Sequence, residues 1–156
     1  MPASGSDFIE MLTEAAFVRR LGMEVEMIEP DRAVLVLPFD DEAVTVQDII
    51  HGGAIASLID TAAVVAAWSN VGPLGDRPRG ATVSLTVNYL SSARSQSIAA
   101  EAKVQRRGSR IVFLEVTVTG VGDGIVIATA LVTYSLYAAS VETSFGNSGP
   151  AAPEPT

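Results

Sequence analysis

A long apolar segment with one carboxylate in its middle constrains the fold of this chain more than any other feature. Across residues 54–68 the only polar side chains are Ser57, Asp60 and Thr61, so the segment suits the interior of a protein. Its pattern predicts a buried helix. A lone buried carboxylate is costly unless it is paired, hydrogen-bonded or protonated, so Asp60 needs a specific reason to be there.

The only histidine and a pair of glycines stand just before this helix, as His51, Gly52 and Gly53. A helix N-terminus presents unsatisfied N–H groups and a positive dipole end, and glycines let a substrate carbonyl come close. These residues predict an oxyanion site, and Asp60 adds an oxygen nucleophile or a base. The chain has no cysteine, so a thiol nucleophile and a thiolate metal site are excluded.

Length and charge narrow the class of protein further. With 156 residues and 48% hydrophobic content, the chain fits one domain over residues 1–139, followed by a Ser-, Gly- and Pro-rich tail at 140–156 that we expect to be disordered. A net charge of -8 argues against nucleic acid or an anionic membrane as partner. The start of the chain lacks a signal peptide pattern, and we expect a soluble cytoplasmic protein.

Periodic patterns elsewhere predict another helix, a hairpin and further strands. Residues 7–21 have helical spacing, with Ser6 or Asp7 as the cap and Gly22 as the end, and residues 39–50 form a loop. The predicted strands are residues 23–28, 32–37, 82–90, 97–107, 110–120 and 125–137. Short links favour antiparallel pairing, which gives an α+β fold with a sheet of about six strands wrapped around one long central helix.

Strict alternation divides the strand at residues 82–90 into two faces. The apolar face holds Val83, Leu85, Val87 and Tyr89. The polar face holds Thr82, Ser84, Thr86 and Asn88. This strand is therefore expected to have a dry side and a polar side.

The order of these elements resembles the hotdog fold over about residues 8–138. Residues 51–60, with an acid nine positions after the histidine, are similar to the motif of acyl-CoA thioesterases related to the phenylacetate-pathway enzyme. The resemblance implies hydrolysis of an acyl-CoA thioester by a homo-oligomer that needs no metal or organic cofactor.

The resemblance also implies a role for each residue of the motif. Asp60 acts as nucleophile or general base, and the Gly52 N–H binds the thioester oxygen. His51 helps hold the loop, and the hydroxyl of Thr82 helps orient water. The family usually has Asn or Gln six residues before the histidine and glycine three before it. Here those positions are Thr45 and Asp48, and Gln47 is a displaced substitute.

Helical geometry adds an expectation about assembly. If the helix begins near His51, Asp60 lies about 13 Å along its axis and on the opposite face. One chain then cannot bring both residues to one substrate. We therefore expect a homodimer, or a dimer-of-dimers tetramer, in which Gly52 of one subunit and Asp60 of another share a site.

Positive charge gathers around one predicted hairpin of this acidic protein. Its basic residues are Arg94, Lys103, Arg106, Arg107 and Arg110. Such a patch suits the phosphates of coenzyme A, with Arg106, Arg107, Arg110 and Gly53 as the predicted CoA contacts. A solvated hairpin is the alternative.

Other interpretations of the same residues stay open. Asp60 could be a core acid bonded to Ser57 or to the backbone of a neighbouring chain. His51 could be a helix cap, and Thr82 an ordinary strand residue. The chain could bind acyl-CoA without cleaving it, act as a hotdog hydratase or dehydratase, or serve only as a structural assembly protein.

Overall fold

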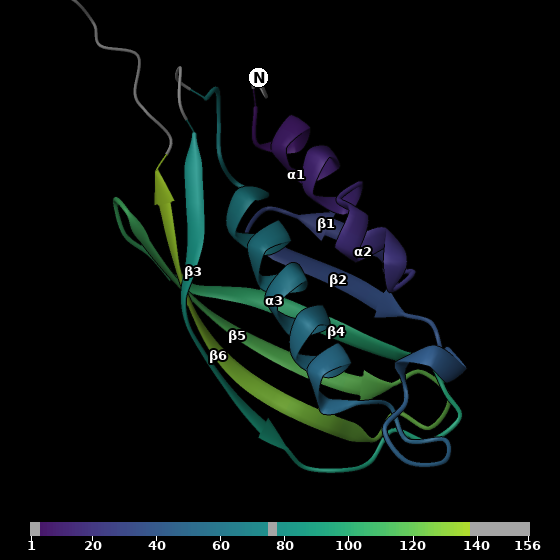
Figure 1. Cartoon of the computed structure of the whole chain (residues 1–156). Helices are drawn as coiled ribbons and strands as arrows, with labels where there is room; N and C mark the ends of the chain where they lie inside the picture. Colours follow the sequence, from purple (N-terminus) through teal and green to yellow (C-terminus); the bar gives the residue numbers. More distant parts are fainter. Residues whose placement is uncertain (1–3, 75–77, 138–156) are drawn as a thin grey trace, which may run out of the picture.

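The computed structural model describes residues 4–74 and 78–137 (Figure 1). Its helices are α1 (Gly5–Thr13), α2 (Ala16–Arg20) and α3 (Gly52–Trp68), with a short 3-10 helix, η1, at Asp41–Ala43. Its strands are β1 (Glu24–Glu29), β2 (Arg32–Leu37), β3 (Arg79–Tyr89), β4 (Ile98–Arg107), β5 (Ile111–Gly120) and β6 (Val126–Tyr137). The predicted tail at 140–156 lies outside the described residues.

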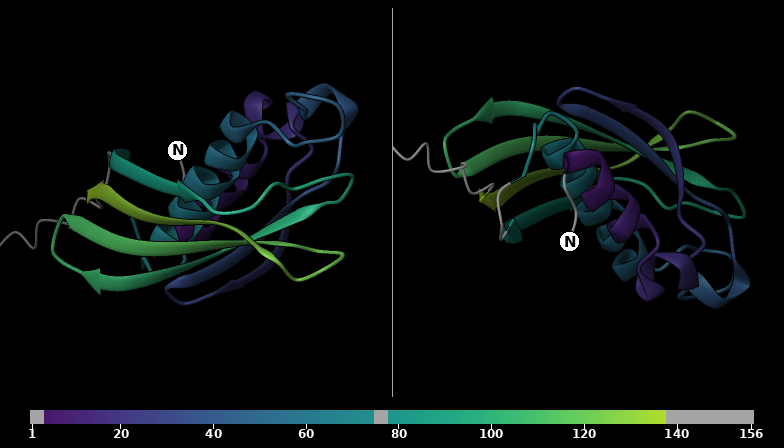
Figure 2. Two further views of the ribbon diagram at one scale, coloured as in Figure 1. Left: turned by 90° about the horizontal axis from the view of Figure 1, so that it is seen from below. Right: turned by 90° about the horizontal axis from the view of Figure 1, so that it is seen from above.

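The strands form one antiparallel sheet that curves around α3. The strand order is β1-β2-β4-β5-β6-β3, so β1 and β3 are its two edges. Figure 2 shows α3 along the concave side of the sheet, with α1 beside it. The predicted α+β class, the six-stranded antiparallel sheet and the long central helix are confirmed.

Helix α3 forms the centre of the core because nearly all of its side chains are apolar. Leu58, Ile59, Val65 and Trp68 are fully buried in the core, and burial of each such side chain stabilises the fold by roughly 1.5–3 kcal/mol. The indole N–H of Trp68 donates to the Tyr134 hydroxyl at 2.9 Å, which satisfies its polar atom. In the described ranges, no helix combines the length and apolar character needed to cross a membrane.

The single helix predicted at residues 7–21 is wrong, because two helices occupy this segment. Ala15 has an extended backbone, with ψ of 141°, and separates α1 from α2. The cap also lies earlier than predicted. The Ser4 side chain accepts from the Asp7 N–H while the Asp7 carboxylate accepts from the Ser4 N–H, which forms a reciprocal capping box.

Strand β3 contains one extra residue, and this changes the face onto which Thr82 points. Thr82 pairs with Tyr134 of β6, and the register then shifts before Ser84. The bulged residue, Val83, is 60% exposed. Because a bulge re-aims neighbouring side chains, Thr82 and Leu85 share the inner face of the sheet. The predicted alternation is therefore wrong at Thr82 and Val83.

Candidate active site

His51 caps the N-terminus of α3. Its backbone is extended, with ψ of 135°, and its Nδ1 accepts from the Gly53 N–H at 2.8 Å. A Cβ on Gly53 would lie 2.9 Å from that nitrogen, so the imidazole occupies the space that a side chain at this position needs. The second glycine of the motif is thus explained by the histidine that precedes it.

Gly52 is the first residue of α3, and its N–H has no acceptor within the helix. Throughout residues 4–74 and 78–137, no acceptor for this N–H is found. Its carbonyl, in contrast, accepts from the Tyr89 hydroxyl at 2.8 Å. Of the two glycine N–H groups, that of Gly53 is already used by His51 and that of Gly52 is available to a ligand.

Asp60 lies half-buried in the middle of α3, and its Oδ1 accepts from the Thr82 hydroxyl at 2.6 Å. The alternative bond to Ser57 does not form, because the Ser57 hydroxyl donates to the Gly53 carbonyl at 2.7 Å. Burial raises the pKa of Tyr134, the hydrogen bond from the Trp68 side chain opposes this, and the charge of Asp60 adds to the rise. A neutral buried phenol therefore lies near the carboxylate.

The relative position of the Gly52 N–H and the Asp60 carboxylate follows from where α3 starts. His51 precedes the helix, so the rotation is counted from Gly52. Eight helical residues place Asp60 about 12 Å further along the axis and about 80° around it. The opposite-face position was counted from His51, and counting from Gly52, the donor, reduces the rotation to this smaller angle. The axial separation remains too long for one carbonyl group to contact both Gly52 and Asp60.

Asp48 fastens the loop before α3 to the segment between β3 and β4. Its carboxylate accepts from the Ser95 hydroxyl at 2.7 Å and from Arg94 at 2.8 Å. The Ser95 bond, together with the Arg94 bond, holds the pKa of Asp48 below its usual range despite the opposing effect of desolvation. Thr45 and Gln47 are exposed, and Gln47 has a φ of 55°.

Arg107, a predicted CoA contact, bonds to groups inside the chain. Its Nε donates to Asp31 at 3.0 Å, and its Nη2 donates to the Ala67 carbonyl at 3.0 Å. Asn70 also donates to Asp31, at 2.8 Å. Arg107 therefore ties the β1–β2 turn to the last turn of α3, where a positive charge is favourable. This engagement argues against the predicted role in CoA binding.

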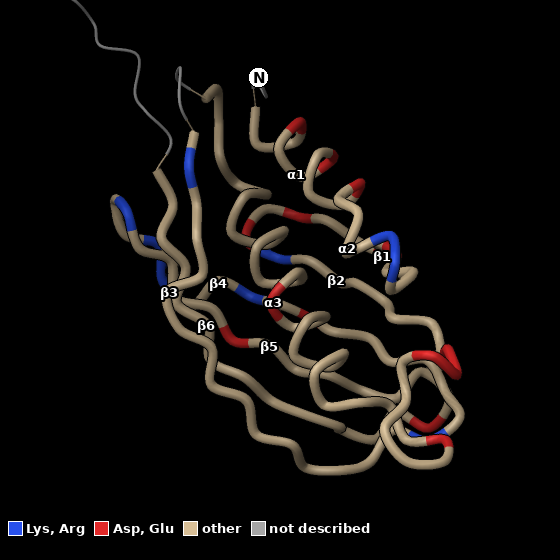
Figure 3. Tube along the Cα trace, viewed as in Figure 1, with Lys and Arg blue, Asp and Glu red and all other residues tan. Residues whose placement is uncertain are grey.

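The basic residues of the predicted cluster differ in whether they form ion pairs. Arg94 and Lys103 each pair with a carboxylate. Arg106 and Arg110 are exposed, and no carboxylate of the described ranges pairs with either. Figure 3 shows positive charge at the β4–β5 hairpin and at the start of β3, at one end of the sheet.

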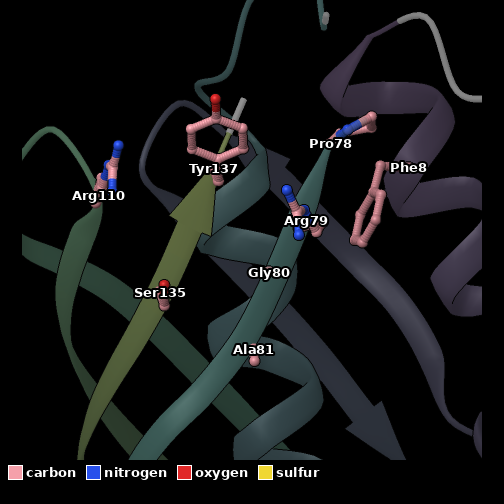
Figure 4. Close-up of a pocket in the computed structure, with 8 residues that line it drawn as sticks. All are labelled: Phe8, Pro78, Arg79, Gly80, Ala81, Arg110, Ser135 and Tyr137. Carbon is pink, nitrogen blue, oxygen red and sulfur yellow. The ribbon is translucent and has the colours of Figure 1, made fainter. Parts of the chain in front are cut away.

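A pocket of about 800 Å³ lies where β3 begins and β6 ends (Figure 4). Arg79 and Arg110 both line it, and their guanidinium carbons lie 5.7 and 5.4 Å from the centre of the Tyr137 ring. Arg79, like Arg110, has no carboxylate partner in the part of the chain that the structure describes. Two uncompensated cations at a pocket favour an anionic ligand.

Sequence reasoning missed Arg79, Tyr137 and Tyr89. Arg79 and Tyr137 are cross-strand partners in β3 and β6, so only the pairing of distant segments brings them together. Tyr89 was assigned to the dry face of its strand, a position that predicts packing and gives no sign of a bond to Gly52.

The arrangement supplies a free N–H at the start of α3, and a carboxylate with its hydroxyl partner in the middle of the helix. A free N–H at a helix N-terminus can stabilise a developing oxyanion, and a carboxylate can take a proton from water. No group of three or more His, Asp or Glu side chains suited to a metal ion occurs in residues 4–74 and 78–137.

A family model and a sequence relative that match this chain are both thioesterases. The model of the thioesterase superfamily matches residues 47–127, which include the His-Gly-Gly segment, Asp60 and Thr82. The medium/long-chain acyl-CoA thioesterase YigI of Salmonella typhimurium is 33% identical over 132 residues, or 76% of this chain and 83% of that protein.

Two solved structures have the same fold. A thioesterase family protein from Silicibacter pomeroyi superimposes with a TM-score of 0.78 at 22% identity, over 87% of this chain and 100% of that one. A mutant of the phenylacetic acid degradation protein PaaI from Thermus thermophilus superimposes with a TM-score of 0.68 at 20% identity, over 78% and 98%. The predicted hotdog fold is confirmed.

Proposed function

The chain belongs to the thioesterase superfamily, and on this basis we propose that it hydrolyses an acyl-CoA to a free acid and CoA, with Asp60 as the essential carboxylate. The activity named for its relative YigI supports an acyl-CoA as the substrate class. The observation that carries the proposal is the hydrogen bond from Thr82 to Asp60, at 2.6 Å, because it orients a carboxylate that the apolar helix would otherwise not favour.

The reaction assigns one task to each group. The thioester oxygen accepts from the free N–H of Gly52, which stabilises negative charge as the carbonyl carbon is attacked. Asp60 acts as general base on water, or attacks the carbon itself to form an anhydride that water then opens. The C–S bond breaks and CoA leaves as a thiolate, which takes up the proton that water loses in the reaction. Thr82 holds one carboxylate oxygen, so the other faces the water or the substrate.

A site shared between two subunits resolves the separation of Gly52 and Asp60. A single chain places them about 12 Å apart along α3. A two-fold axis that sets two α3 helices side by side in opposite directions brings Gly52 of one subunit to Asp60 of the other. We therefore propose a homodimer, or a dimer of dimers, with composite sites.

The pocket formed by Arg79, Arg110 and Tyr137 is our candidate for the CoA nucleotide. Guanidinium groups bind phosphates well, and these two have no carboxylate partner in the described ranges. Arg79 is three residues from Thr82, or about 10 Å along the strand, so the pocket lies within reach of a flexible thioester arm. Arg106 is exposed near the end of β4, in the β4–β5 hairpin that also contains Arg110, and is a further candidate contact.

A second candidate function is acyl-CoA binding without hydrolysis. It is favoured by the loop before α3, where Asp48 forms an ion pair at the position that is glycine in the resembling family. A screen of aryl, short-chain and long-chain acyl-CoAs, read by thiol release, separates the two functions. The protein has no cysteine and gives no thiol background. Binding of a thioester without thiol release would support the second function.

A further inference from the structure

Tyr89, the last residue of β3, contacts the N-terminus of α3. Its side chain is 53% exposed, yet its hydroxyl donates to the Gly52 carbonyl at 2.8 Å. Its ring carbons lie 3.5 Å from the position that a Cβ on Gly52 would occupy. The phenol therefore both bonds to this glycine and covers one side of it.

We propose that Tyr89 is a positioning residue that holds the Gly52 N–H in place for the thioester oxygen. This inference rests on the proposed function, because it assigns Tyr89 a role only through Gly52. It extends that function by adding a second residue of β3 to the site. Thr82 acts on the carboxylate, and Tyr89 acts on the oxyanion donor.

Two hydrogen bonds hold the peptide that follows the donor. Tyr89 donates to the carbonyl of the peptide between Gly52 and Gly53, and the N–H of that same peptide donates to His51. Donation to one end of a peptide strengthens donation from its other end. Tyr89 and His51 thus fix this peptide from both sides. The preceding peptide, which carries the Gly52 N–H, is held at its carbonyl end, because the His51 carbonyl accepts from the Ala54 N–H at 2.9 Å.

The first turn of α3, which carries the Gly52 N–H, also needs the support of a bond from outside the helix. The first turn of a helix frays readily, and Gly52 and Gly53 add backbone freedom that other residues lack. A donor that must meet a developing oxyanion is effective only when it is held in place before the reaction. The bond from Tyr89 ties this turn to a sheet strand and removes much of that freedom.

The test compares Tyr89→Phe, which removes the hydroxyl and keeps the ring, with wild-type enzyme. The matched control is Thr86→Val, which removes an exposed hydroxyl from the same strand. We expect Tyr89→Phe to lower kcat about five- to tenfold with KM within twofold, and hydrogen exchange of the Gly53 amide to accelerate severalfold. Tyr89→Leu, which also removes the ring, should lower kcat further. Thr86→Val should change neither quantity.

Other outcomes overturn the proposal. An unchanged kcat for Tyr89→Phe means that the hydroxyl has no positioning role. A raised KM at constant kcat means that Tyr89 binds substrate directly. A lowered kcat with unchanged exchange at Gly53 means that the hydroxyl acts on the substrate and not through Gly52.

Asp60→Asn, assayed in parallel, separates this inference from the proposed function. If Asp60→Asn is inactive while Tyr89→Phe is normal, only the inference on Tyr89 fails. If Asp60→Asn retains full turnover, the proposed function fails first, and the Tyr89 inference fails with it.

Discussion

Thr82 donates a 2.6 Å hydrogen bond to Asp60, and it does so because a bulge at Val83 turns its side chain toward α3. Without the extra residue, Thr82 and Leu85 would lie on opposite faces of β3, as the plain alternation of the sequence predicts. Bulges are frequent next to active sites, where they re-aim a side chain. The bulge in this edge strand therefore positions Thr82 to bind Asp60 of α3.

We predict that Thr82→Val lowers kcat about tenfold while the protein stays folded. The substitution keeps the shape of the side chain and removes the donor to a charged acceptor, and such bonds contribute roughly 1.5–3 kcal/mol. Steady-state kinetics of thiol release measure the effect, and circular dichroism checks the fold. An unchanged kcat would mean that the bond between Thr82 and Asp60 is only structural.

Replacing Arg79 and Arg110 together by Gln should raise KM for an acyl-CoA at least tenfold. The same change should alter KM for an acyl-pantetheine, which lacks the nucleotide, by less than twofold. The phosphate contacts would also make the wild-type KM rise with salt. The matched control is Arg19→Gln with Arg20→Gln, which removes two exposed charges from α2. Equal effects on the two KM values would mean that this pocket does not bind the CoA nucleotide.

Arg107→Ala should destabilise the protein without weakening CoA binding. It removes three hydrogen bonds that join the β1–β2 turn to the end of α3, two to Asp31 and one to Ala67. The expected loss is roughly 1–3 kcal/mol of unfolding free energy, measured as a lower denaturant midpoint at constant slope. A raised KM for acyl-CoA with unchanged stability would restore Arg107 as a substrate contact.

The shared site predicts rescue between two inactive variants. His51→Ala damages the Gly52 end of a site, and Asp60→Asn damages the carboxylate end. When the two proteins are unfolded together and refolded, about half of the dimers should be mixed, each with one intact site. Roughly a quarter of wild-type activity should then return. If mixed dimers form and remain inactive, each chain supplies both groups to its own site.

Regular periodicity allowed much of the fold to be predicted from the sequence. The segment at 54–68 is so uniformly apolar that it predicted a buried central helix, and it forms most of α3 (Gly52–Trp68). The hairpin of β1 and β2 was also expected, because a Glu-Pro-Asp turn separates two segments with a strand pattern.

Other features depended on contacts that no local pattern records. Nothing at Thr82 or Val83 marks an extra residue, since the register of β6 creates the bulge. Arg107 looked like a free surface charge because its partner, Asp31, is distant in sequence. Apolar spacing continues through Ala15, so the break between α1 and α2 was not visible either.

The most direct test of the central role of Asp60 is the turnover of Asp60→Asn on the best substrate from the acyl-CoA screen. We predict that kcat falls by about 10² to 10⁴, the range for loss of a positioned acid–base group, with a normal circular dichroism spectrum and a KM within a few-fold of wild type. A folded Asp60→Asn protein that releases CoA at near the wild-type rate would contradict the mechanism and remove Asp60 from the reaction.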